Sequence, residues 1–158
     1  MKRFLTPLLL GRALLAPLPA AAQNAEADNM RILREKMMGD KKLIVAANMA
    51  LTDAESKAFW PIYDAYQAEL QKINEQLGTI IADYARMHNA GKLTDARARA
   101  LMDRYLGAEE AEVRLKRTFA KRLDKVLPGV KVTRYLQIEN KIRAIVKYEL
   151  AGEVPLAK

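Results

Sequence analysis

The chain has 158 residues and a formal net charge of +8, from 27 basic and 19 acidic side chains, and it contains no cysteine. The absence of cysteine excludes a disulfide framework, a thiolate nucleophile and cysteine-bound zinc, so packing alone must stabilise the fold. A chain of this length is the size of one ordinary domain with a modest core.

Residues 1–22 have the layout of a secretory signal peptide. Two basic residues precede an apolar stretch, which Pro19 and three consecutive alanines follow. The stretch is shorter than the roughly 20 apolar residues of a permanent membrane span, and Arg12 interrupts it. We therefore predict cleavage after Ala22 and a periplasmic protein without a stable transmembrane anchor. A retained N-terminal anchor is the main alternative, ahead of a cytosolic protein.

Removal of this segment leaves 24 basic and 19 acidic side chains, a net charge of +5. Residues 23–28 are expected to be disordered, residues 29–150 to form a single all-α domain, and residues 151–158 to form a C-terminal tail. Gly and Pro are sparse, and long stretches of Ala, Leu, Glu, Lys and Arg favour helix. An exported, mildly basic protein meets anionic partners, such as acidic unfolded chains or membrane surfaces, more readily than nucleic acid.

A first helix is predicted from about residue 29 to about residue 50. Gly39 and Asp40 interrupt its apolar stripe, which consists of Met30, Leu33, Met37 and Ile44. Three methionines cluster in this helix, namely Met30, Met37 and Met38, and methionine suits a soft metal or an adaptable protein-binding surface. We favour ordinary packing because copper sites usually add histidine, and we expect no metal or other cofactor.

The clearest periodic signal is a heptad seam whose spacings alternate between four and three residues. It runs through Phe59, Tyr63, Tyr66, Leu70, Ile73, Leu77, Ile80, Tyr84 and Met87. Thr52 and Glu55 form a capping box of the S/T-x-x-E type, which predicts a long helix from residue 53 to about residue 88. Pro61 lies inside this helix and removes one backbone hydrogen bond, so we expect a kink near it rather than an end.

A second seam at similar spacing follows the short, turn-like residues 89–92. It runs through Leu101, Tyr105, Ala108, Glu112, Leu115, Phe119 and Val126, with Leu123 near its end. Thr94 caps this helix without a full capping box, because Arg97 stands where Glu would be. We predict that residues 52–88 and 94–126 form an elongated antiparallel helical hairpin. A last helix after Pro128, from about residue 129 to about residue 150, makes four helices, with one flanking the hairpin at each end.

No catalytic constellation is visible, and we expect a binding protein rather than an enzyme. His88 is the only histidine, and it is placed in the predicted loop without an Asp or Glu at metal-ligand spacing. Glu109 and Glu110 are interpreted as ion-pair partners on a helix surface. The chain also lacks a Gly-rich phosphate loop, a G-x-S-x-G elbow and an H-E-x-x-H motif.

Charge is unevenly distributed along the chain. Residues 50–90 carry six acidic and three basic side chains, whereas residues 114–134 carry eight basic side chains and one acidic. The functional hypothesis is a basic platform that captures acidic or unfolded partners, and the alternative is a solvated helix face partly paired with the acidic arm. The predicted client-binding residues of the platform are Arg114, Lys116, Arg117, Lys121, Arg122 and Lys125.

An aromatic cluster at the start of the long helix adds one further candidate. Phe59, Tyr63 and Tyr66 lie on the seam and are expected in the core, whereas Trp60 and Ile62 fall off it. A thin hairpin cannot bury every apolar residue, so the surplus must cover the flanking helices, a dimer partner or a client. Trp60 is therefore the aromatic member of the predicted client-binding set.

The order of these elements resembles the periplasmic Spy/CpxP-like proteins, which are named for their LTxxQ motifs. The resemblance covers the order of elements over most of residues 30–148 and rests on the exported N-terminus, the LTDAE box that begins at Leu51, the second long helix and the closing helix after a Leu-Pro break. Glu55 replaces the Gln of the first motif, and the place of the second, taken by residues 127–131, keeps only Leu127.

The resemblance implies an elongated four-helix fold, commonly a cradle-shaped homodimer with a basic concave face that also carries apolar patches. Members of the family act as ATP-independent chaperones, as negative regulators of envelope-stress kinases or as metal-responsive sensors. Our leading hypothesis is a chaperone or holdase of the bacterial envelope that binds acidic or unfolded protein clients. The alternative is an envelope-stress signalling adaptor that binds the periplasmic domain of a sensor kinase or an anti-sigma protein.

Overall fold

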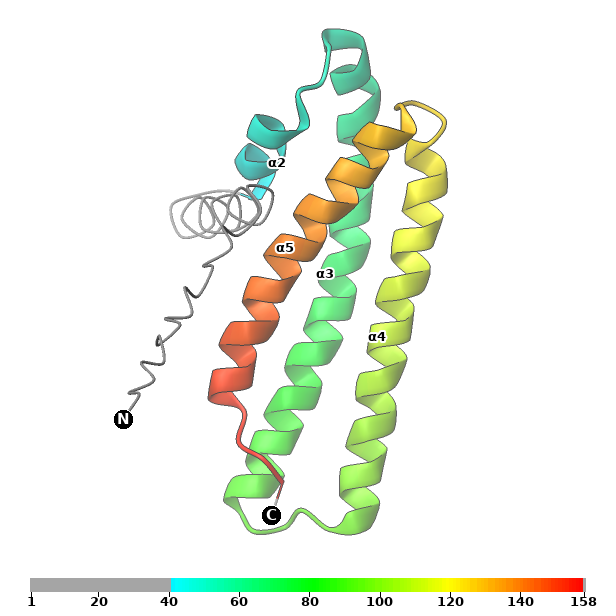
Figure 1. Cartoon of the computed structure of the whole chain (residues 1–158). Helices are drawn as coiled ribbons and strands as arrows, with labels where there is room; N and C mark the ends of the chain where they lie inside the picture. The colour runs from blue at the N-terminus through cyan, green and yellow to red at the C-terminus, as the bar shows by residue number, and fades with distance from the viewer. Residues whose placement is uncertain (1–40, 158) are drawn as a thin grey trace, which may run out of the picture.

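The computed structural model describes residues 41–157, which form helices α2 (Lys41–Met49), α3 (Asp53–Asn89), α4 (Asp95–Leu123) and α5 (Gly129–Glu153) (Figure 1). These residues contain no strand, so the predicted all-α fold class is confirmed. None of the four helices combines the length and the apolar character that a membrane crossing needs. The predicted signal peptide, the predicted disordered segment 23–28 and the three clustered methionines of the first helix lie outside the described residues.

Helix α3 begins where the capping box predicts. The Glu55 N–H donates to Thr52 Oγ1 at 3.3 Å, and the Thr52 N–H donates to Glu55 Oε2 at 2.8 Å. Two of the orphan amides of the first turn are thereby satisfied. The helix continues through Pro61, which is exposed, so the backbone hydrogen bond that proline removes is lost at the surface rather than in the core.

Helix α3 ends one residue beyond the predicted boundary, and this corrects the interpretation of His88. His88 belongs to the last turn of the helix rather than to the loop, and its ring stacks on the Tyr84 ring at a centroid distance of 5.6 Å. In the loop that follows, Gly91 has a φ of +62°, a conformation that glycine adopts without strain. Thr94 then caps α4 by accepting the Arg97 N–H at 3.4 Å.

Helix α4 ends at Leu123, three residues before the predicted boundary. Residues 124–127 form a turn in which the Val126 N–H and the Leu127 N–H both donate to the Leu123 carbonyl at 2.9 Å. Pro128 prevents the helix from continuing into α5, because a proline cannot donate a backbone hydrogen bond and disfavours helical backbone in the residue before it. Helix α5 follows at once and continues to Glu153 rather than stopping near residue 150, so the C-terminal tail begins at Val154.

The helices make an elongated bundle in which α3 and α4 lie side by side and run in opposite directions, while α5 returns across them (Figure 1). We call the end with the α2–α3 and α4–α5 connections the upper half and the end with the α3–α4 loop the lower half. Toward the lower half, α5 moves away from α4 (Figure 1). Helix α5 therefore covers α4 more completely in the upper half than in the lower half.

The apolar core is concentrated in the upper half. The aromatic rings of Phe59, Tyr63 and Tyr66 on α3 meet Tyr135 of α5 at centroid distances of 5.3 to 6.1 Å, mostly edge to face. Residues from α2 complete this cluster, and Val45 and Met49 have no exposed surface. The core cluster of the lower half consists of Ile73, Leu77 and Ala108. The seam therefore predicts the buried face of α3 correctly, but the depth of the core differs between the two halves.

Candidate binding surfaces

Three of the six predicted basic residues share one face of α4. Arg114, Arg117 and Lys121 are exposed, and spacings of three and four residues place them on the side away from the buried Phe119. Lys125, in the turn that follows the helix, is also exposed. We call these four residues the basic row. Its helical part, from Arg114 to Lys121, is about 10 Å long at ~1.5 Å per residue.

Three members of the basic row have no acidic partner within the described chain. Arg114 pairs with Glu110 at 3.3 Å on the surface, whereas no carboxylate of residues 41–157 forms an ion pair with Arg117, Lys121 or Lys125. Lys131, by contrast, pairs with Glu55 at the start of α3. The alternative of a basic stretch paired with the acidic arm therefore holds for Lys131 but not for the row.

Lys116 and Arg122 lie apart from the row. Lys116 Nζ is 2.7 Å from Glu112 Oε1 and donates to Asn140 Oδ1 at 3.3 Å, and only 24% of its side chain is exposed. The guanidinium of Arg122 lies over the Phe119 ring, 4.5 Å from its centre. Lys116 thus contributes to packing between α4 and α5, and it is less accessible than the residues of the row.

Trp60, the predicted aromatic contact, lies against α2. Its Nε1–H donates to Ser56 Oγ at 2.8 Å, and its ring is 5.0 Å from the Phe59 ring. Lys42 of α2 places its ammonium 5.2 Å from the centre of the Trp60 ring. The ring of Trp60 therefore packs largely against the flanking helix α2. The structure does not bring Trp60 together with the basic row.

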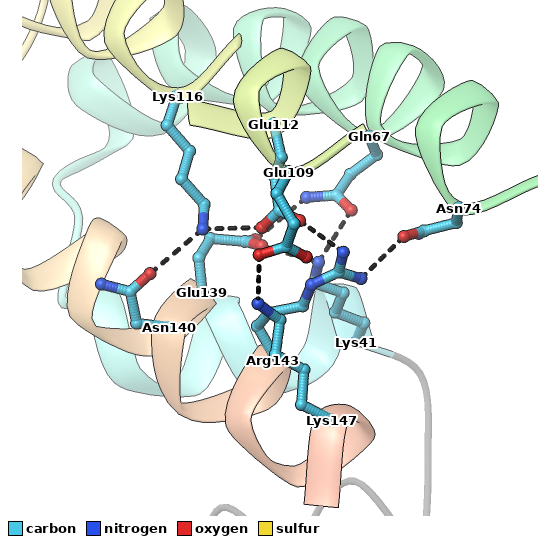
Figure 2. Close-up of polar contacts among 10 residues, drawn as sticks. All are labelled: Lys41, Gln67, Asn74, Glu109, Glu112, Lys116, Glu139, Asn140, Arg143 and Lys147. Carbon is cyan, nitrogen blue, oxygen red and sulfur yellow. Dashed lines mark hydrogen bonds and ion pairs between the residues drawn. The ribbon is translucent and has the colours of Figure 1, made fainter. Parts of the chain in front are cut away.

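A layer of buried charges crosses the middle of the bundle, and sequence reasoning missed it. Glu112 of α4 is 4% exposed and pairs with Lys116 and with Arg143 of α5. Glu139 of α5 is 3% exposed, accepts from Lys41 Nζ at 2.7 Å and accepts from Gln67 Nε2 at 3.0 Å. Figure 2 shows these side chains converging from all four described helices, α2, α3, α4 and α5. We call this set the polar layer.

Two further contacts extend the polar layer toward the surface (Figure 2). Arg143 donates to Asn74 Oδ1 at 2.8 Å, and Lys147 Nζ is 2.7 Å from Glu109 Oε2. Burial raises the pKa of Glu112, but the hydrogen bond from Lys116 and the charges of Arg143 and Lys116 more than offset this effect, so the pKa lies below its ordinary value. The carboxylate therefore stays ionised at neutral pH.

A cavity of about 420 Å³ lies beside the polar layer. Polar side chains, including Gln67, Glu112 and Arg143, form part of its wall, and aliphatic side chains such as Leu70 and Ile142 form the rest. Tyr66 also lines the cavity. Its buried hydroxyl has no hydrogen-bond partner among the described residues, and burial raises the pKa of that hydroxyl well above its usual range. The described part of the chain holds no cluster of His, Asp and Glu that could bind a metal.

A second cavity, in the lower half, has a different character. It also measures about 420 Å³ and lies between α3, α4 and α5, with Ile81, Tyr84, Met102, Tyr105 and Leu150 in its wall. We call it the apolar groove. Met102 is 59% exposed and Tyr105 39%, although Tyr105 belongs to the predicted seam, because α5 has moved away from α4 at this level (Figure 1). Sequence periodicity identifies the apolar stripe on α4, but it does not show that α5 leaves part of this stripe uncovered.

Comparison of the chain with protein-family models, with curated proteins and with solved structures gives no match. The resemblance to the Spy/CpxP-like proteins therefore stays a prediction from the sequence.

Proposed function

We propose that the protein is an ATP-independent chaperone of the bacterial envelope that captures acidic, unfolded protein chains. The observation that carries this proposal is the basic row, in which Arg117, Lys121 and Lys125 face solvent without a carboxylate partner in residues 41–157. Such a strip attracts negatively charged chains over several ångströms and speeds their encounter. The predicted signal peptide of residues 1–22 supports a periplasmic location for this activity.

The helix that carries the row is held in place before a client arrives. Its inner face packs against α3 through Phe119 and Leu123, which are 5% and 1% exposed. Glu112 ties the same helix to Arg143 of α5. A row presented on a fixed helix loses little conformational freedom on binding, so weak contacts suffice for capture. Capture by charge would then be followed by holding of apolar client segments, with no nucleotide involved.

Charge reversal on the row tests the proposal. The variant Arg117→Glu/Lys121→Glu should associate about 10-fold more slowly with reduced, carboxymethylated α-lactalbumin, a permanently unfolded acidic chain, at low salt. The control is Lys92→Glu/Arg99→Glu, which changes the net charge equally at exposed positions outside the row. About 1 M salt, with a Debye length of roughly 3 Å, should remove the difference between the two variants. Stopped-flow fluorescence measures the rates, and circular dichroism checks helicity.

Two results would count against the proposal. Equal association rates for the two variants would show that the row has no special role in capture. Failure of the wild-type protein to bind unfolded chains, combined with co-purification of a single folded envelope protein, would favour the signalling adaptor. Mass spectrometry of the envelope fraction tests the export step separately, with an expected N-terminus near Gln23.

A further inference from the structure

The chain's own C-terminal tail, a short extended peptide, lies along the apolar groove and forms part of its wall. Helix α5 ends at Glu153, and Val154 follows with extended backbone angles. Val154 and Ala157 both line the groove. Figure 1 shows the tail descending beside α3 to the level of the α3–α4 loop.

A hydrogen bond from a side chain of α3 to the backbone of the tail holds the tail there. The Tyr84 hydroxyl donates to the Pro155 carbonyl at 2.7 Å. A carbonyl belongs to every residue of every chain, so this contact recognises an extended peptide without regard to its sequence. The wall around it is largely apolar, and its one charged side chain, Lys147, is engaged with Glu109.

The tail leaves much of the apolar surface of the groove uncovered. Leu156, its largest apolar side chain, is 88% exposed, and Met102 and Leu150 in the wall remain 59% and 39% exposed. A segment with apolar side chains in better register would cover more of this surface than the tail does, and burial of apolar surface favours binding. The tail is therefore a weak occupant that a better peptide can displace.

We propose that the apolar groove is the holding site for extended apolar segments of unfolded clients, and that residues 154–157 compete with those segments in the free protein. This inference rests on the proposed chaperone function and divides it in two. The basic row on α4 sets the rate of capture, and the groove in the lower half sets the time for which the client is held.

Deletion of residues 155–158 is the direct test, because α5 keeps its full length. Removing the competitor should tighten binding of carboxymethylated α-lactalbumin. Tyr84→Phe removes only the hydroxyl that bonds the tail and, by this proposal, also a bound client. When it is added to the deletion variant, it should weaken binding of the unfolded α-lactalbumin by about 2- to 10-fold, the equivalent of one hydrogen bond. Met102→Glu places a charge in the groove and should raise the dissociation rate while leaving the low-salt association rate unchanged.

Tyr148→Glu is the matched control, since Tyr148 is 83% exposed on α5 and does not line the groove. It should bind as the wild type does. An unchanged or weaker affinity of the deletion variant, or equal dissociation rates for Met102→Glu and Tyr148→Glu, would overturn the inference. If these results appear while reversal of the basic row still slows capture, the groove assignment fails and the chaperone proposal stands. If the wild-type protein binds no unfolded chain, both fail together.

Discussion

The two halves of the bundle are built from the same helices but differ in how completely those helices cover one another. In the upper half, α2 adds a fourth layer, and aromatic side chains from α3, α4 and α5 meet in the core. In the lower half, the buried cluster has three residues, Ile80 and Leu101 are also buried, and apolar side chains line an open groove. One continuous set of helices thus has a closely packed half and a half in which packing leaves apolar surface uncovered, and uncovered apolar surface is available to a partner.

The largest loss of stability is expected when an aromatic ring is removed from the core of the upper half. Phe59 is fully buried and packs against Trp60 and Tyr135. Phe59→Ala should lower the free energy of unfolding by about 3–5 kcal/mol, because it leaves a cavity that the surrounding rings cannot fill. Tyr105→Ala removes an aromatic ring from the partly exposed wall of the groove and should cost about 1 kcal/mol or less. Urea unfolding measures both, and equal losses would contradict the division into halves.

The next largest loss of stability is expected from a change in the polar layer, which lies at the boundary between the halves. Arg143→Met removes a buried partner of Glu112 but leaves Lys116 paired with it. We expect a loss of about 2–3 kcal/mol, somewhat less than the cost of isolating a buried charge completely. The double variant Glu112→Leu/Arg143→Met should recover part of this loss, since it removes the buried charge that the single variant leaves underpaired. A double variant less stable than Arg143→Met would contradict this account.

Acidification should lower the free energy of unfolding by a smaller amount, through protonation of Glu112 in the polar layer. The pKa of Glu112 is below its ordinary value of 4.5 in the folded protein, so the unfolded chain binds this proton more readily. The stability contributed by the carboxylate is therefore present above the ordinary value and is lost as the pH falls through the folded pKa. Urea midpoints measured between pH 7 and pH 3 should fall less steeply for Glu112→Gln than for the wild type. Parallel pH profiles would show that Glu112 has no part in the acid response.

The smallest expected change strengthens the chain instead of weakening it. Gly78 and Gly107 lie inside α3 and α4, and a Cβ added at either meets no atom within 4 Å. Gly78→Ala and Gly107→Ala should each raise the free energy of unfolding by about 0.5–1 kcal/mol, because alanine loses less backbone freedom on folding. Gly91→Ala is the control, and it should destabilise the protein because its φ of +62° strains an alanine. Thermal unfolding separates the three variants.

Local signals in the sequence predicted most of the fold. Thr52 and Glu55 determine the start of α3, because capping requires only residues that are neighbours along the chain. The end of α4 was predicted three residues too late, since the apolar seam reaches Val126 whereas Pro128 stops the helix earlier. Periodicity describes which side of a helix is apolar, and the last turn depends on the backbone that follows it.

The binding surfaces could be predicted only in part. Spacing on a helix is a local property, so the common face of Arg117 and Lys121 follows from the sequence. The inward position of Lys116 depends on Glu112, and a glutamate on an apolar seam was the one available signal for a buried partner. Its other partner, Arg143, lies 31 residues away on α5. Such a pairing requires knowledge of how α5 crosses α4, which periodicity does not supply.

The polar layer also limits how the helices can move. Sliding α5 by one helical turn along its neighbours would displace Arg143 by about 5.4 Å, farther than an ion pair with Glu112 can stretch. The buried charges therefore oppose axial sliding. A sideways swing of the lower end of α5 would break the more exposed pair of Lys147 and Glu109 but can keep the buried pair of Glu112 and Arg143. The same feature that joins the two halves thus fixes the register of the helices and leaves outward bending as the motion by which the lower end can widen.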